Sequence, residues 1–295
     1  MKKITLLFLL LIQVLWVKGQ SEELTVDEQA VYQAMVDSIE SALTYQHGTV
    51  NLENGMATLH VPEGYKFLDA EQSDYVLTEL WGNPPSPVLG MLFPEEVGPL
   101  SDSMAYAVEI SYSEEGYIDD EDAQELDYDD LLEQMQEDTE EGNAARADAG
   151  YVPVHFLGWA APPFYDVEHK KLHWAKELQF EGETTNTLNY NIRVLGRRGY
   201  LNLNAIGTME VLPQFQQDVD KVLASVSFNE GHRYSDFNPD IDRIAAYGIG
   251  GLIAGKLLTK VGFLAVLAKF WKVIALAVAG IFGGLRKKIF PSKNS

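Results

Sequence analysis

The chain of 295 residues contains no cysteine. No disulfide therefore holds its fold together, and neither a thiolate metal site nor a lipid-modified cysteine can form. Basic side chains are also scarce, because 22 Lys and Arg stand against 44 Asp and Glu, for a formal net charge of −22. The phosphates of DNA and RNA repel such a surface, so we expect no nucleic-acid partner.

The charge is distributed unevenly along the chain. Residues 20–241 hold 43 acidic and 10 basic residues, whereas residues 242–295 hold 1 acidic and 9 basic residues. An apolar run at 244–285 lacks acidic residues altogether, and three basic residues follow it at 286–288. About 20 helical residues suffice to cross a hydrocarbon core. The sequence therefore predicts a membrane anchor with a basic tail over residues 239–295.

The N-terminus indicates the orientation of the anchored chain. Lys2 and Lys3 precede an apolar stretch at 4–17, a pattern typical of a signal peptide. We therefore expect a signal peptide at 1–19 and an acidic extracytoplasmic domain at 20–238. An uncleaved N-terminal anchor is the alternative.

One crossing near residues 262–285 fits the positive-inside rule best, with a glycine-rich helix at 244–260 on the outer interface. The protein would then be a single-pass protein of the bacterial cytoplasmic membrane with a cytoplasmic C-terminus. A helical hairpin and a surface-bound tail remain alternatives. Glycines at small-xxx-small spacing in this segment predict helix packing, with simple tolerance of glycine as the alternative. They are Gly251, Gly255, Gly280 and Gly284.

Between these segments the hydrophobic periodicity changes repeatedly from strand to helix. The pair Asn54-Gly55 between two alternating segments predicts a hairpin with a two-residue type I′ turn. We expect helices near 26–44, 70–80, 128–135 and 211–226, and strands near 49–53, 56–61, 88–93, 104–112, 154–160, 172–180, 187–195 and 200–206.

Strands grouped in hairpins with helices between them predict an α+β fold, in which helices cover an antiparallel sheet. The order of the elements is analogous to the sandwich of the photosystem accessory PsbP and Mog1 type. Such an analogy concerns the fold and assigns no function.

Five sequence runs resemble a bacterial family of membrane-anchored proteins, domain of unknown function 2167. They are PEGYKFLD (62–69), PPFYD (162–166), LHWAKEL (172–178), LNYNIRVLGRRGYLNLN (188–204) and RYSDFNPDIDRIAAYGIGGLIAG (233–255). The resemblance covers residues 48–290. It implies an exported domain with a C-terminal membrane segment, and it implies no reaction, cofactor or catalytic residue.

An acidic belt at 114–141 carries 15 carboxylates and no basic residue. Carboxylates are the hard ligands that Ca²⁺ prefers, but the belt lacks the central glycine of an EF-hand loop. We expect mainly a solvated helical face, with a specific calcium site or weak, diffuse binding of divalent cations as alternatives. The candidate ligands are Asp119, Asp120, Asp122, Asp127 and Asp129.

A second group of residues combines aromatic side chains with the scarce arginines. One strand's exposed side chains from this group would form a binding face; the alternative is that the arginines neutralise the acidic helices within the domain. The group is Tyr165, Asp166, Trp174, Tyr190, Arg193, Arg197 and Arg198.

No nucleophile motif such as G-x-S-x-G is present. The sequence therefore favours a non-enzymatic interaction module anchored in the cell envelope, without a cofactor, that contacts the bilayer and an envelope protein. One alternative is an envelope hydrolase or other enzyme whose site is assembled from distant residues. Another is an accessory subunit of a membrane transport complex.

Overall fold

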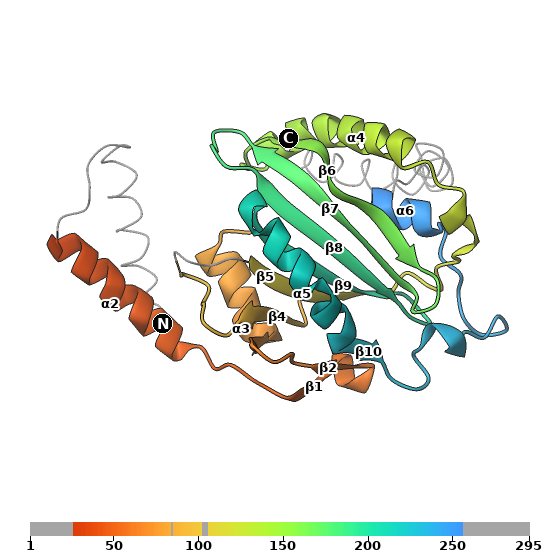
Figure 1. Cartoon of the computed structure of the whole chain (residues 1–295), viewed down its shortest axis with the longest axis horizontal. Coiled ribbons are helices and arrows are strands. Elements are labelled where there is room, and N and C mark those ends of the chain that lie inside the picture. Colours follow the sequence, from red (N-terminus) through yellow and green to blue (C-terminus); the bar gives the residue numbers. More distant parts are fainter. Residues whose placement is uncertain (1–25, 84, 102–105, 256–295) are drawn as a thin grey trace, which may run out of the picture.

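The structure, a computed structural model, describes residues 26–83, 85–101 and 106–255. A seven-stranded antiparallel sheet with the order β3-β4-β5-β9-β8-β7-β6 lies beside a three-stranded sheet with the order β1-β2-β10 (Figure 1). The strands are β1 Thr49–Leu52, β2 Ala57–His60, β3 Tyr65–Asp69, β4 Gly90–Pro94, β5 Tyr106–Ser113, β6 Val154–Asp166, β7 Lys171–Phe180, β8 Thr187–Leu195, β9 Tyr200–Thr208 and β10 Val226–Phe228. The helices are α2 Val26–Ala42, α3 Ala70–Tyr75, α4 Tyr128–Asp148, α5 Leu212–Ser225 and α6 Ile249–Ala254. The predicted α+β class with an antiparallel sheet is confirmed.

Both faces of the large sheet are covered, and each face has its own core. On one face Tyr190 and Ile192 of β8 pack with Phe215 of α5 and with the small sheet. On the other face Trp174 of β7 packs with Leu252 of α6 and with α4. Figure 1 shows α5 crossing in front of the sheet and α4 running beside β6. Alternating side chains of a strand point to opposite faces, so each central strand contributes to two environments.

The predicted hairpin of β1 and β2 is present, but its turn is longer than expected. Leu52 pairs with Ala57, so four residues connect the strands instead of two. Glu53 and Asn54 both have positive φ angles, 42° and 54°, and Gly55 has 86°. Three left-handed residues in a row add length that a type I′ turn does not have.

Strand β6 extends to Asp166, well beyond the predicted end at residue 160. It lies at the edge of the sheet, and its register against β7 is interrupted by three bulges. An edge strand tolerates Pro162 and Pro163 because its outer N–H groups need no partner strand. The prolines and bulges also protect this edge from pairing with another chain.

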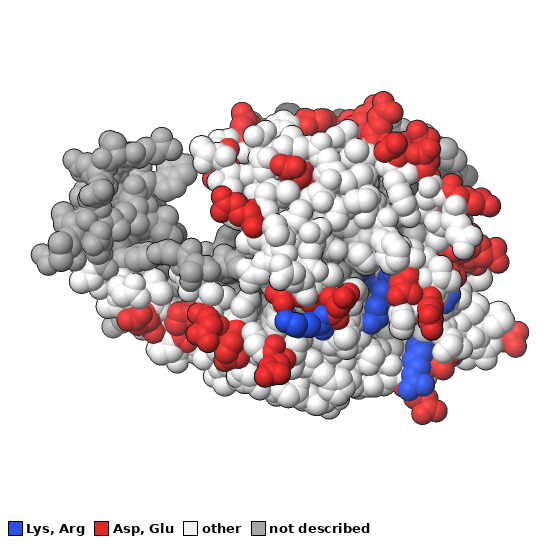
Figure 2. All heavy atoms as spheres, in the orientation of Figure 1, with Lys and Arg blue, Asp and Glu red and all other residues white. Residues whose placement is uncertain are grey.

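The acidic belt contains α4, whose N-terminus is capped by Asp127. The Asp127 carboxylate accepts hydrogen bonds from the backbone of Asp129 and Asp130. Met135 is buried against the sheet, while acidic side chains occupy the surface over this helix, at the top of Figure 2. The helix thus docks one apolar side and exposes most of its acidic side chains, as expected for a solvated helical face.

The chain after β10 packs back onto the domain, although residues 239–255 were expected to belong to the anchor. Ile244 forms a parallel bridge with Tyr117. Helix α6 follows, and the carboxylate of Asp122 accepts hydrogen bonds from the backbone of Ile249 and Gly250. A six-residue helix is too short to be stable alone, so this cap and the apolar contacts of α6 with α4 fix its position.

No helix in the described part of the chain is long and apolar enough to cross a membrane. The predicted signal peptide at 1–19 and the predicted crossing near 262–285 lie outside the described residues, as do Gly280 and Gly284.

Candidate functional site

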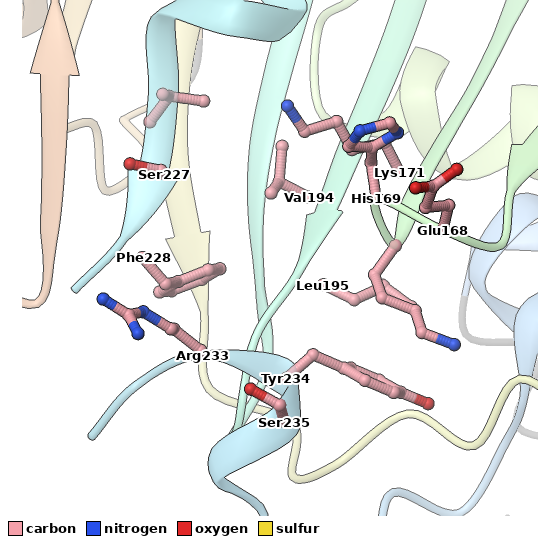
Figure 3. Close-up of a pocket in the computed structure, with 12 residues that line it drawn as sticks. Glu168, His169, Lys171, Val194, Leu195, Ser227, Phe228, Arg233, Tyr234 and Ser235 are labelled. Carbon is pink, nitrogen blue, oxygen red and sulfur yellow. The ribbon is translucent and has the colours of Figure 1, made fainter. Parts of the chain in front are cut away.

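A cleft of about 410 Å³ opens where the β6–β7 turn, β10 and the ends of β8 meet the helical turn Tyr234–Asp236 (Figure 3). Val194, Leu195 and Phe228 contribute an apolar lining. Lys171 and Arg233 contribute cations, and Figure 3 draws them on opposite sides of the cleft. The carboxylate of Glu168 also lines the cleft, beside His169. The arrangement therefore combines an apolar surface with two separated positive charges and one negative charge on the side of the β6–β7 turn.

This concentration of basic groups is unusual for the domain. On the face shown in Figure 2, red side chains are spread widely, whereas the few blue ones gather in the lower right part. Residues 20–241 hold 43 acidic and 10 basic residues, so basic groups are scarce on this surface, and those visible in Figure 2 lie beside acidic ones.

Lys171 begins β7, and the sheet directs it toward the C-terminus of α5. Its Nζ donates a hydrogen bond of 2.6 Å to the carbonyl oxygen of Leu223. A helix C-terminus carries partial negative charge, which favours an ammonium there. Burial nevertheless lowers the pKa of Lys171 below its ordinary value, and the charge of Asp166 only partly opposes this. One carbonyl satisfies one of three N–H groups, so Lys171 keeps the capacity to bind a further acceptor.

Arg233 stands at the start of the helical turn, which its backbone helps to build. Its backbone N–H donates to the Asp236 carboxylate at 3.0 Å. Its side chain is exposed, and within the described part of the chain its guanidinium forms no ion pair. Arg233 therefore presents a planar, permanently charged group suited to a carboxylate.

The neighbouring Lys170 is already neutralised by the chain itself. Its Nζ lies 2.7 Å from the carboxylate of Asp120. Asp120 also accepts hydrogen bonds from the hydroxyls of Tyr165, at 2.6 Å, and Tyr234, at 2.9 Å. Burial alone would raise the pKa of Asp120, but these hydrogen bonds outweigh it and hold the pKa below its ordinary value. The network fixes one wall of the cleft and leaves Lys170 no free charge.

His169 is held by an acid in a manner familiar from catalytic dyads. Its Nδ1 lies 2.7 Å from the Asp166 carboxylate. A nucleophile would have to meet the other ring nitrogen, yet within the described residues neither Ser227 nor Ser235 forms a hydrogen bond with His169. Figure 3 draws both serines away from the imidazole. The cleft thus contains the parts of an acid–base pair without an assembled nucleophile.

The predicted aromatic and arginine group does not form one exposed face. Trp174 and Tyr190 are only 1% and 3% exposed. Trp174 pairs with Asn191 across β7 and β8, which places the adjacent Tyr190 on the opposite face. Arg193 lies half-buried on the same face as Trp174, with its guanidinium carbon 5.0 Å from the centre of the Trp174 ring. The prediction of one exposed face is therefore wrong, because neighbouring residues of a strand point to opposite faces of the sheet.

The remaining members of the group serve the chain internally. Tyr165 binds Asp120, and Asp166 binds His169, both beside the cleft. Arg197 and Arg198 both donate to the carboxylate of Asp242, at 2.6 Å and 2.9 Å. These two arginines are thus neutralised within the chain, but by Asp242 of the C-terminal segment and not by the acidic helices that the alternative named.

The candidate calcium ligands bind donors of their own chain. Asp119 accepts from the backbone of Glu121, and Asp127 from that of Asp129, while Asp120 and Asp122 have the partners given above. No group of three or more His, Asp or Glu that could hold a metal ion occurs among the described residues. The hydrogen bonds within the chain engage Asp119, Asp120, Asp122 and Asp127 separately, in caps, turns and the Lys170 ion pair.

Of the four glycines predicted to pack membrane helices, two lie within the described range. A Cβ at Gly251 would lie 2.6 Å from the Cβ of Tyr247, so close packing inside the domain requires glycine there. Gly255 follows α6 with a φ of +68°, a value that favours glycine at a helix end.

The sequence analysis missed Lys171 and Arg233 as cleft residues. They are far apart in the sequence, and β10 and its following turn bring them together. The scarcity of basic residues was the available signal, but it does not reveal which of them lack acidic partners.

The chain is similar to a described protein family and, distantly, to a solved structure. A family model described as "Protein of unknown function (DUF2167)" matches residues 44–283. No curated protein matches the chain. The solution structure of cyanobacterial PsbP (CyanoP) from Synechocystis sp. PCC 6803 is similar with a TM-score of 0.36 and 9% identity, covering 72% of this chain and 98% of that one. A likeness of this degree supports no conclusion about function.

Proposed function

The chain belongs to the family of proteins of unknown function DUF2167, and since that family assigns no activity, we propose a function from the cleft. We propose that the protein is a non-enzymatic binding module of the bacterial cell envelope. Its cleft recognises a carboxylate group carried by a partner molecule.

One observation carries this proposal. Lys171 and Arg233 line the same cleft from opposite sides, and within the described part of the chain neither has a carboxylate at ion-pair distance. Four of the nine other Lys and Arg of the described residues do have such a partner, namely Lys170, Arg197, Arg198 and Lys221. Two uncompensated cations beside Phe228 suit a ligand with a negative group and an apolar portion.

Binding of a glutamate peptide tests the proposal. A fluorescein-labelled peptide of six glutamates is titrated with the full chain in mild detergent, and fluorescence anisotropy is recorded. We expect binding by the wild-type chain and about tenfold weaker binding by Arg233→Met, the size of one lost charge-assisted hydrogen bond. Lys171→Met should have a similar effect.

The matched control is Lys221→Met, which removes an exposed cation that is paired with Asp218 outside the cleft. This variant should bind as the wild type does, and a six-glutamine peptide should not bind. Equal weakening by Lys221→Met and Arg233→Met would show that diffuse charge, and not the cleft, attracts the peptide. Absence of binding to the wild type would reject the proposal.

Membrane anchoring is part of the same proposal and rests on the sequence. The apolar run at 244–285 contains no acidic residue and ends at three basic residues. Helix α6 uses the start of this run inside the domain, which leaves the crossing near 262–285. The basic residues then stay in the cytoplasm, as the positive-inside rule prefers. A reporter active only in the cytoplasm, fused after Ser295, should be active; activity of an export-only reporter would instead indicate a hairpin.

An enzymatic function is the second candidate, and the pair Asp166–His169 favours it. It predicts turnover of an ester substrate that His169→Ala abolishes and Lys171→Met preserves. A role as an accessory subunit of a transport complex would instead appear as co-purification with a transporter in mild detergent.

A further inference from the structure

A polar layer lies on the sheet face opposite the cleft, beneath the α4 and α6 side. Four neighbouring strands supply it: β5 with Glu109 and Ser111, β9 with Asn202 and Asn204, β8 with Asn189, Asn191 and Arg193, and β7 with Trp174 and Lys176. Trp174 and Asn191 are buried and the other members are half-buried, whereas a sheet face packed against helices normally carries apolar side chains. This concentration of polar groups in the middle of the sheet therefore needs an explanation.

The strand register places these residues in contiguous rows. Glu109 pairs with Asn204, Asn204 with Asn191, and Asn191 with Trp174. In the neighbouring row Ser111 pairs with Asn202, and Asn202 pairs with Arg193. Residues directly opposite on adjacent strands have Cβ atoms about 5 Å apart. The layer is therefore one connected surface and not a scatter of separate polar residues.

Arg193 is the centre of the layer. One of its Nη atoms donates to the side chain of Asn202, and its guanidinium carbon lies 5.0 Å from the Trp174 ring and 5.5 Å from the Tyr200 ring. Stacking on both rings fixes the plane of the guanidinium.

The layer carries an excess of positive charge. Arg193 and Lys176 lie close enough to repel each other, and the carboxylate of Glu109 interacts with Arg193. Burial, and then the charge of Arg193, lower the pKa of Lys176 to about 8. Within the described part of the chain Lys176 has neither a hydrogen bond nor an ion pair. Lys176 is half-buried, so its ammonium is partly desolvated beside a second cation, and an anion at this place would favour its charged form.

Unpartnered polar atoms gather in the same place. Three of the five buried side-chain atoms without a hydrogen-bond partner are Arg193 Nε, Trp174 Nε1 and Asn204 Oδ1. Buried polar groups in folded proteins are nearly always paired with protein, water or ligand. Two of the three are N–H donors, and with the ammonium of Lys176 they form a set of donors that no acceptor of the described chain satisfies.

We propose that this layer is a second binding site, which takes a small carboxylate between Arg193 Nε, Trp174 Nε1 and Lys176 Nζ. The carboxylate offers acceptors to all three donors and offsets the repulsion between the two cations. The site is independent of the cleft because it lies on the opposite face of the sheet.

The indole N–H of Trp174 provides a direct readout. The full chain, labelled with ¹⁵N, is titrated with sodium acetate and, at equal ionic strength, with sodium chloride. We expect acetate, and not chloride, to shift the Nε1–H resonance of Trp174, which Trp174→Phe identifies. The indole groups of Trp81 and Trp159 already donate to the carbonyls of Pro99 and Tyr128, so their resonances should stay in place.

Lys176→Met tests the role of the ammonium while keeping the length of the side chain. We expect the apparent dissociation constant for acetate to rise about tenfold, in a protein that is at least as stable as the wild type. The cleft variant Arg233→Met should retain the acetate shift, which separates this site from the proposed function. No shift of Trp174, an equal shift with chloride, or an unchanged response in Lys176→Met would overturn the proposal, since ordered water would then satisfy the donors.

Discussion

At the scale of single residues, Asp242 connects the segment after β10 to the β8–β9 turn. Its carboxylate, which has no exposed surface, accepts hydrogen bonds from Arg197 and Arg198 of the β8–β9 turn. It also accepts one from the backbone of Asn238 at 2.8 Å. Hydrogen bonding by Arg197, against the opposing effect of burial, holds the pKa of Asp242 well below its ordinary value. Asp242 therefore contributes stability in its ionised form.

Asp242→Asn should lower the melting temperature at pH 7, because it removes the charge that both arginines bind. A carboxyl group with a depressed folded-state pKa stabilises the fold above its unfolded pKa and loses that effect as pH falls toward the folded value. The difference between wild type and variant should therefore be constant from pH 7 to about 5 and shrink below about pH 4. Thermal unfolding followed by circular dichroism across this range measures it.

The exposed neighbour Asp240 is the control for this prediction. Asp240→Asn should change the melting temperature little at any of these pH values. A wild-type advantage over Asp242→Asn that persisted undiminished at pH 2 would mean that the carboxylate acts by shape and not by charge.

At the scale of elements, α6 shows how an apolar segment can be mistaken for a membrane helix. Ile249, Leu252 and Ile253 are buried against the α4 side of the sheet. The run is also glycine-rich, and in sequence it continues without a break into the apolar stretch that follows. The period of its apolar residues is the same for a domain-packed helix and a membrane helix, so only the tertiary contacts distinguish them.

Leu252→Ala should destabilise the domain by about 2–5 kcal/mol, since it leaves a cavity under α6. Asp122→Ala should cost about 1 kcal/mol through the loss of the helix cap. Urea unfolding of the full chain in detergent gives both values. Ile244→Ala, at a site that is 56% exposed on the same segment, should cost less than about 0.5 kcal/mol. Equal, negligible effects for all three variants would mean that α6 is detached from the domain.

Most elements could be predicted from the sequence because their apolar residues follow one clear period. The alternation of apolar residues in β8 and β9 predicted these two strands with bounds close to the observed ones. The helical spacing of Phe215 and Val222 did the same for α5. Strands β3 and β10 were missed. β10 has only three residues, too few to show a period, and its pairing with β2 joins segments more than 150 residues apart.

The candidate site was less predictable, for the same physical reason. Whether a cation is free depends on its neighbours in space, and Lys170 and Lys171 are adjacent in sequence yet differ in this respect. Asp120 neutralises the first, whereas a helix carbonyl holds the second. Likewise, the sequence shows polar residues at every second position of β8, at Asn189, Asn191 and Arg193. Their meaning could not be inferred without knowing that both faces of the sheet are covered.

At the scale of the whole molecule, repulsion between carboxylates works against the fold. The chain has a net charge of −22, and the Lys and Arg ion pairs of the described residues are few. They are Lys170–Asp120, Arg197–Asp242, Arg198–Asp242 and Lys221–Asp218. Like charges on an exposed surface such as that of α4 interact over about 10 Å at 0.1 M salt and about 3 Å at 1 M.

Sodium chloride should therefore raise the melting temperature of the full chain, because screening removes more repulsion than attraction. Differential scanning calorimetry from low salt to about 1 M measures the trend. Sucrose at matched osmolality serves as the control for general stabilisation by excluded solutes. A melting temperature that stayed constant or fell with salt would show that the few ion pairs outweigh the acidic belt.

The packing of residues 239–255 onto the domain also determines how far the molecule can reach. A binding head on a long flexible linker sweeps a large volume and meets partners at many heights above a membrane. Here the ion pairs of Asp242, the bridge between Tyr117 and Ile244, and the packing of α6 hold the chain against the domain as far as Gly255. With the proposed anchor in the bilayer, the domain would keep close to the membrane surface, and its cleft could meet only molecules found within about the domain's own diameter of the lipid.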